Sequence, residues 1–186
     1  MQKNFRFTYV VNEKTNQGDL YNQLNVNEFL EAALSGYSVT IFAYGQTGSG
    51  KTYTMAGVEE KFSHEVFKSD ETDGIIPRAI KNLWKFSQSG KEKYSIKASF
   101  TEIYNEQIRD LLNPTSGVLH CRWNPANGFF VEDLVIVDCT SINDLIAVLN
   151  EGIRNRKSGS HELNKDSSRS HSLMTIYVVG EISGEG

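Results

Sequence analysis

Apolar residues along the chain alternate between the period of a strand and the period of a helix. Alternation over residues 5–10 predicts a first strand, and the short apolar run at residues 39–44 predicts a buried strand. Between them, residues 26–34 place apolar side chains three and four positions apart, which predicts a helix that Gly36 ends. Strands that alternate with helices in this way are typical of an α/β protein.

The same alternation continues beyond the middle of the chain. Residues 58–73 are charged and show no clear period, which predicts a surface loop. Pro77 suits the first turn of a helix, and its apolar face is supplied by Ile80, Leu83 and Trp84. The pattern therefore predicts a loop at residues 58–73 followed by a helix around Pro77.

The C-terminal half reads as strands around one further helix. Residues 94–104, 129–137 and 172–179 predict strands, whereas residues 114–128 contain two prolines and two glycines and predict a loop. The S-x-x-[DE] run from Ser141 to Asp144 predicts the start of a helix. We find no internal repeat and no low-complexity tract.

The most informative local pattern directly follows the predicted strand at residues 39–44. It fits G-x-x-x-x-G-K-[ST], the P-loop that binds nucleoside triphosphates, and consists of Gly45, Gln46, Thr47, Gly48, Ser49, Gly50, Lys51 and Thr52. Glycines let successive backbone N–H groups point inward at phosphate oxygens. The Lys51 ammonium can reach the β- and γ-phosphates, and the Thr52 hydroxyl can bind Mg²⁺. A helix starting near Gly50 would add its N-terminal dipole, and residues 53–56 can continue such a helix. A chance Gly/Ser loop is the alternative, but a strand before and a helix after are the context that the P-loop requires.

Three runs together resemble one family. Residues 36–55 resemble the P-loop segment of a kinesin motor domain, and residues 164–171 match its switch I pattern, N-x-x-S-S-R-S-H. Residues 102–112 resemble the family's E-I-Y-N-E-x-I-x-D-L-L stretch. The resemblance implies an α/β P-loop NTPase fold with a mixed central sheet flanked by helices, and residues 1–186 as a partial motor domain. It also implies that ATP and Mg²⁺ are the cofactors.

The family resemblance assigns roles to four residues of the switch I pattern. Asn164 would contact the γ-phosphate side, Ser167 would help position the attacking water, and Ser168 would approach Mg²⁺ together with Thr52. Arg169 would pair with an acidic residue of switch II. Such a polar segment can sense the γ-phosphate, which a P-loop alone cannot do. Without the resemblance, a solvated Ser-rich loop before a strand would explain the same residues.

Three residues near these motifs have two interpretations each. Tyr53 resembles the family position that packs near the nucleotide base, and an ordinary core aromatic would explain it equally well. Glu102 and Glu106 could form a carboxylate pair, but nothing beyond their spacing supports this, so a structural role is expected.

The sequence also departs from the family pattern. Thr8 stands where the family usually has Asp, and His161 where it usually has Thr. The base-holding R-x-R-P and the switch II pattern D-x-x-G-S-E are both missing. Two interpretations follow: an ATP-driven microtubule motor domain of which this chain is the N-terminal part, or a nucleotide-binding but catalytically inactive truncated module. For the chain alone, we expect little hydrolysis.

Composition is that of an ordinary globular domain. Apolar residues make up 39%, charged residues 23%, and the net charge is −4, which gives no reason to expect nucleic acid binding. Contact with an acidic microtubule must therefore come from local basic patches. The two cysteines form no pair or metal-ligand spacing, and no signal peptide or membrane-spanning run is found. The sequence predicts a cytoplasmic protein, the family resemblance implies association with microtubules, and neither indicates an oligomeric state.

Overall fold

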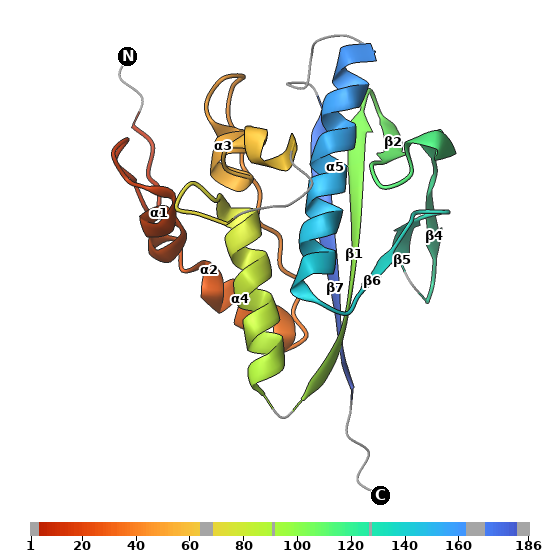
Figure 1. Ribbon diagram of the computed structural model, residues 1–186, viewed down its shortest axis with the longest axis horizontal. Coiled ribbons are helices and arrows are strands. Elements are labelled where there is room, and N and C mark those ends of the chain that lie inside the picture. The colour runs from red at the N-terminus through yellow and green to blue at the C-terminus, as the bar shows by residue number, and fades with distance from the viewer. Residues whose placement is uncertain (1–3, 64–68, 91, 127, 163–169, 182–186) are drawn as a thin grey trace, which may run out of the picture. The chain divides into compact units, whose positions relative to one another are not determined.

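A computed structural model describes residues 4–63, 69–90, 92–126, 128–162 and 170–181. Its chain forms two compact units (Figure 1). The first consists of Met1–Val58 and Lys68–Phe86, and the second of Glu59–Phe67 and Ser87–Gly186.

The first unit is helical. It contains α1 (Gln17–Gln23), α2 (Val26–Leu34), α3 (Lys51–Met55) and most of α4 (Ile75–Ser89). Asn16 caps α1, because its side-chain oxygen accepts from Asp19 N–H at 2.8 Å while its amide nitrogen donates to the Asp19 carboxylate. A left-handed residue, Asn25 (φ 51°), turns the chain between α1 and α2.

One apolar cluster holds the helices of this unit together. Tyr21, Val26 and Ile75 are buried at its centre. Partly buried side chains from the flanking segments pack against them, namely Leu24, Ile41, Met55 and Ala79. Because Met55 belongs to α3, the short helix is tied to the core by its last residue.

The helix predicted at residues 26–34 is confirmed as α2, and Gly36 follows it at φ 92°. The two predicted strands of this unit are wrong. Residues 5–10 and 39–44 form no strand, and several of their apolar side chains are exposed, including Phe42 at 77% and Tyr44 at 95%. A strand needs a hydrogen-bonded neighbour as well as an apolar pattern, and neither segment has one among the described residues.

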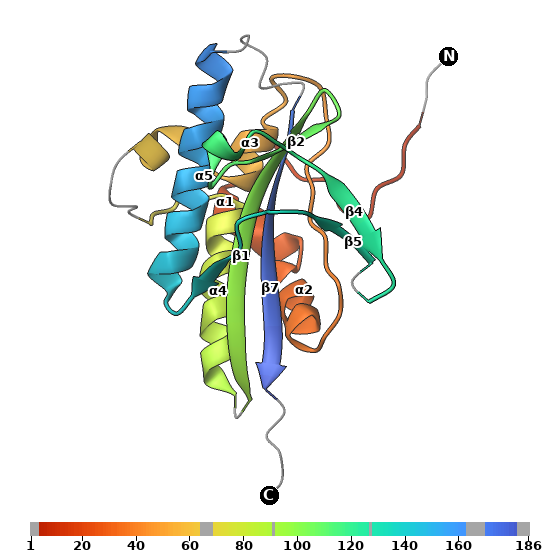
Figure 2. The same cartoon turned by 90° about the vertical axis from the view of Figure 1, so that its right-hand side faces the viewer.

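The second unit is built on a five-stranded antiparallel sheet (Figure 2). Its strands are β1 (Lys93–Tyr104), β2 (Gln107–Asp110), β3 (Val118–Leu119), β6 (Val137–Cys139) and β7 (His171–Glu181). The central strand β1 pairs with β7 along residues 93–103, with β6 at residues 96–98 and with β2 at residues 101–104. Since a strand has two edges, β2 and β6 share one edge of β1 and β7 takes the other. A separate hairpin joins β4 (Cys121–Asn124) to β5 (Gly128–Val131).

Helix α5 (Ile142–Glu162) lies along the sheet in both ribbon views. Its buried side chains Leu145, Val148 and Leu149 supply the apolar face of the helix. A Cβ at Gly152 would overlap the Phe100 ring, so the helix approaches β1 more closely there than any larger residue would allow.

The start of α5 is confirmed at the predicted capping residues. The Asp144 carboxylate accepts from the backbone N–H groups of Ser141 and Thr140, both at 2.8 Å. These bonds favour the charged carboxylate and lower the pKa of Asp144. In return, Asp144 N–H donates to the Ser141 hydroxyl, which completes a reciprocal cap.

The remaining predictions are confirmed for three elements and differ from the structure where the chain turns. The strands predicted at residues 94–104 and 172–179 are confirmed as β1 and β7, and the helix around Pro77 as α4. The strand predicted at residues 129–137 is wrong, because the chain turns at left-handed Asp133 (φ 59°) and divides this run between β5 and β6. The predicted loop at residues 114–128 contains β3, β4 and a 3₁₀ turn, η2 (Pro114–Ser116). The predicted surface loop at residues 58–73 contains a second 3₁₀ turn, η1 (Glu59–Ser63), in which Phe62 is buried.

The predicted mixed sheet is antiparallel in every ladder of the described strands. The sheet, α5 and the helical unit agree with the predicted α/β class.

Buried Asp110 stabilises the turn that follows β2. Its carboxylate accepts from the N–H groups of Leu112 and Val135 at 2.8 Å each.

Candidate functional site

The P-loop residues form a tight turn that leads directly into α3. Gly48 (φ 78°) and Gly50 (φ 85°) both adopt left-handed conformations that residues with a side chain rarely take. A Cβ at Gly45 would come within 2.6 Å of the Ser49 hydroxyl oxygen, so the loop closes on itself at that point. The backbone path seen here therefore favours glycine at positions 48 and 50.

The Lys51 side chain lies over this loop. Its Nζ donates to the carbonyl oxygens of Gly45 at 2.8 Å and Gln46 at 2.7 Å. An ammonium group carries three N–H donors. Two of them hold the loop closed, which leaves one to face an anion at the loop. The residues present thus fit a phosphate group.

Helix α3 presents Thr52, the last residue of the motif, and Tyr53, which follows it, at the surface. Thr52 is exposed, so its hydroxyl can serve as a metal ligand. Tyr53 is 53% exposed, which excludes the interpretation as an ordinary core aromatic. The helix begins at Lys51, close to the predicted position, but it has only five residues. Its dipole contributes less than the sequence interpretation assumed, because the macrodipole grows from aligned peptide units.

Backbone contacts fix the far end of α3. Gly57 forms an isolated antiparallel bridge with Asp73, and Gly74 N–H donates to the Ala56 carbonyl at 3.3 Å. A Cβ at Gly74 would lie 2.6 Å from Gly57 N, so the two backbones touch at this crossing. Sequence reasoning missed this crossing, because its two partners are separated by a loop without any local signal.

A buried glutamine also contacts α3. Gln17, in α1, donates from Nε2 to the Tyr53 carbonyl oxygen at 2.7 Å. Sequence reasoning did not identify it, because Gln17 precedes Tyr53 by 36 positions. The one signal in the sequence that could have pointed to Gln17 was a polar residue with no surface role next to the apolar face of a helix.

The predicted switch I residues Asn164, Ser167, Ser168 and Arg169 lie outside the described residues. The described segments on either side of them are joined by Arg156 of α5, whose Nη2 donates to the Ser170 hydroxyl at 3.3 Å. The Arg156 Nε also lies 3.6 Å from a Glu102 carboxylate oxygen. Glu102 thus pairs with an arginine, as its expected structural role requires.

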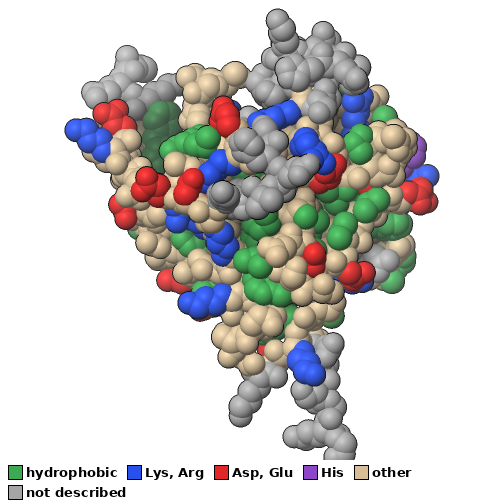
Figure 3. All heavy atoms as spheres, viewed as in Figure 1, with side chains coloured by type: hydrophobic (Ala, Val, Ile, Leu, Met, Phe, Trp, Pro, Cys, Tyr) green, Lys and Arg blue, Asp and Glu red, His purple; other side chains and the backbone are tan. Residues whose placement is uncertain are grey.

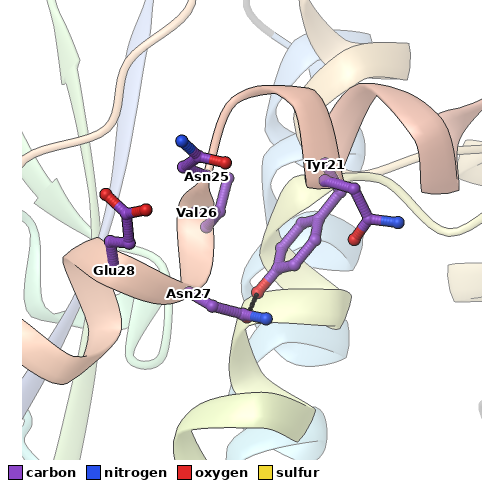
Figure 4. A pocket seen from close by; sticks show the side chains of 6 residues that line it. Tyr21, Asn25, Val26, Asn27 and Glu28 are labelled. Atoms are coloured by element: carbon purple, nitrogen blue, oxygen red, sulfur yellow. Dashed lines mark hydrogen bonds between the residues drawn. The ribbon is translucent and has the colours of Figure 1, made fainter.

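A polar network borders a small hollow elsewhere in the first unit (Figure 4). The Tyr21 hydroxyl donates to the Asn27 side-chain oxygen at 2.8 Å, and Asn82 Nδ2 donates to both groups. Burial raises the pKa of Tyr21. The hollow has a volume of about 150 Å³, and no P-loop residue lines it.

Charges of both signs are interspersed on the face shown in Figure 3. Exposed ion pairs occur in the second unit, such as Lys97 with Asp138 and Arg122 with Glu132, each at 2.9 Å. The local basic patch expected for microtubule contact is not evident among the described side chains of this face. None of the described helices is long and apolar enough to cross a membrane.

Comparison with known proteins gives a consistent result. The family model of the kinesin motor domain matches residues 1–185. The chain is 40% identical over 181 residues to kinesin-like protein KIN-12D of Arabidopsis thaliana, covering 94% of this chain and 6% of that protein. It is 41% identical over 184 residues to kinesin-like protein KIF15 of Mus musculus, covering 95% of this chain and 13% of that protein. The chain thus spans a small part of these relatives.

A solved structure agrees with the sequence matches. It is described as "Structure of a fast kinesin: Implications for ATPase mechanism and interactions with microtubules", and it superposes with a TM-score of 0.86 at 31% identity. The match covers 97% of this chain and 49% of the solved chain. The P-loop geometry, the family model over residues 1–185 and these relatives lead to one conclusion: the chain belongs to the kinesin motor domain family.

Proposed function

We propose that this chain is the nucleotide-binding part of a microtubule-based motor ATPase and that it binds ATP with Mg²⁺. The observation that carries the proposal is the closed P-loop, in which the Lys51 ammonium lies over a turn that only glycines at positions 48 and 50 adopt easily. Family membership supports the same function, since a kinesin motor domain implies nucleotide and microtubule binding.

In this proposal, residues 45–52 hold the phosphates and Tyr53 packs near the base. The exposed Thr52 hydroxyl, together with Ser168, holds Mg²⁺, which supplies charge neutralisation to the phosphates when bound. Asn164, Ser167 and Arg169 act at the γ-phosphate side, with Ser167 positioning the attacking water. These last roles rest on the family resemblance, and so does association with cytoplasmic microtubules.

Calorimetric titration with Mg·ADP and Mg·ATP tests the binding step. Lys51→Ala removes the ammonium that closes the loop and faces the anion, so binding should weaken at least tenfold; a hydrogen bond involving a charged group accounts for about 1.5–3 kcal/mol. Lys85→Ala, which removes an exposed lysine from α4, serves as the matched control and should bind as the wild type does. Equal affinity in the Lys51 variant and the wild type would overturn the assignment.

A second assay separates the motor from the inactive module. Phosphate release is measured with and without microtubules, for this chain and for a longer protein that includes it. Stimulated turnover in the longer protein supports the motor assignment. Nucleotide binding without any turnover in either protein would favour the inactive nucleotide-binding module instead.

A further inference from the structure

Gln17 is a buried polar residue whose two ends have different surroundings. The residue is only 5% exposed, and its Nε2 donates to the Tyr53 carbonyl at 2.7 Å. Its Oε1 is also buried and has no hydrogen-bond partner in the described part of the chain. A buried oxygen without a partner destabilises a fold, so the amide is a poor choice if stability alone matters at this position.

The direction of this amide follows from its acceptor. A carbonyl oxygen can only accept, so the nitrogen and not the oxygen of Gln17 must face Tyr53. The same Tyr53 carbonyl also accepts from Gly57 N–H at 2.9 Å. Two donors from different segments therefore meet on the last turn of α3, directly after Lys51 and Thr52.

An N-cap stabilises the α1 side of this contact. The reciprocal cap between Asn16 and Asp19 orders the first turn of α1, in which Gln17 lies. Helix α3 has five residues and no side-chain cap, and helices this short are unstable in isolation. The location of α3 must therefore be set by its contacts with neighbouring segments.

We propose that Gln17 is a positioning residue for the nucleotide site, which holds α3 through the Tyr53 carbonyl and thereby sets the positions of Lys51 and Thr52. Gln17 does not touch the nucleotide in this arrangement. The inference rests on the proposed function, because it names a residue that supports the same P-loop. This positioning role explains why a buried amide with an unpaired oxygen stands at position 17.

The test compares Gln17→Leu with the wild-type chain. Leucine removes both polar atoms at similar volume, and Gly57 still satisfies the Tyr53 carbonyl. We therefore expect a melting temperature equal to or above that of the wild type, whereas affinity for Mg·ADP falls about fivefold, as the loss of one buried hydrogen bond allows. Gln17→Glu places an acceptor opposite the carbonyl and should weaken binding at least as much, which keeps the test valid if the leucine variant does not fold.

Asn27→Ala is the matched control. It removes the two hydrogen bonds that Asn27 accepts from Tyr21 and Asn82 in the same unit but leaves the Gln17 contact with α3 in place. This variant should lose thermal stability and keep its affinity. If Gln17→Leu binds Mg·ADP as tightly as the wild type, or if affinity falls in proportion to melting temperature in both variants, Gln17 is structural and the proposal is wrong.

A readout without nucleotide separates this proposal from the proposed function. The backbone amide resonances of Gly48 and Gly50 should shift in Gln17→Leu and stay unchanged in Asn27→Ala. If the wild-type chain binds no nucleotide, the proposed function fails, and these resonances decide the positioning role alone. Unshifted resonances in both Gln17 variants would overturn it.

Discussion

Cys139 and Cys121 differ in environment although both are free thiols. Cys121 is exposed, whereas Cys139 is buried. Burial first, and then the nearby carboxylates of Asp144 and Asp138, raises the pKa of Cys139 to about 11. Because the thiolate is the reactive form, iodoacetamide at pH 8 should alkylate Cys121 much faster than Cys139. Peptide mass analysis over time measures this, and the two rates should become equal in denaturant.

The raised pKa of Cys139 also makes the free energy of unfolding depend on pH. Between the unfolded pKa of about 8.5 and about 11, folded Cys139 keeps its proton while the unfolded thiol loses it. The unfolded state then binds fewer protons, so the free energy of unfolding falls as pH rises through this window. The full contribution is present below the unfolded pKa. Melting at pH 8 and pH 10.5 should show a smaller drop in Cys139→Ala than in the wild type, and equal drops would contradict this.

The close approach of α5 to β1 depends on one glycine. In most helix interiors, replacing glycine with alanine stabilises by about 1 kcal/mol. At Gly152 the added methyl group would overlap the Phe100 ring, and overpacking typically costs about 1–3 kcal/mol. We therefore expect Gly152→Ala to lower the free energy of unfolding, measured by urea titration.

A double-variant comparison identifies the cause of that loss. Phe100→Leu shortens the side chain that the methyl group would meet, so alanine at position 152 should cost less in the Phe100→Leu background. An equal cost in both backgrounds would place the strain elsewhere along the helix.

Sequence patterns predicted the helices and long strands better than the short or unpaired segments. Residues 26–34 form their helix because the apolar spacing and Gly36 act locally. Residues 39–44 have a good strand pattern but no strand, since pairing depends on a neighbour that a local pattern cannot supply. The division of residues 129–137 followed from the backbone at Asp133, which composition does not reveal.

The candidate site shows the same contrast. The P-loop was predictable because its phosphate-binding groups come from eight consecutive residues. The support behind it was not, because Gln17 and Gly74 reach α3 from distant parts of the chain. The switch I assignment stays a prediction, as its residues lie outside the described ranges.

The second unit has an open strand edge. Strand β7 pairs with β1 along one edge, and its other edge has no ladder partner among the described strands. This eleven-residue strand carries exposed Leu173 and Val179. Long apolar edge strands promote pairing between chains, so we expect this chain to self-associate as its concentration rises.

Light scattering after size-exclusion chromatography checks this expectation. Val179→Lys places a charge on the open strand and should shift the chain toward monomer at a given concentration. Ala147→Lys adds the same charge on an exposed position of α5 and should have little effect. A monodisperse monomer in the wild type across the concentration series would contradict the prediction.

The contact between Gly57 and Gly74 has a consequence for sequence variation among relatives. Because the backbones at Gly57 and Gly74 are in contact, the segment between them has fixed ends. Lengthening such a loop adds little entropy cost, about 0.6 kcal/mol for each doubling. Related motor domains should therefore differ in the length of this segment, while the two positions at its base stay glycine.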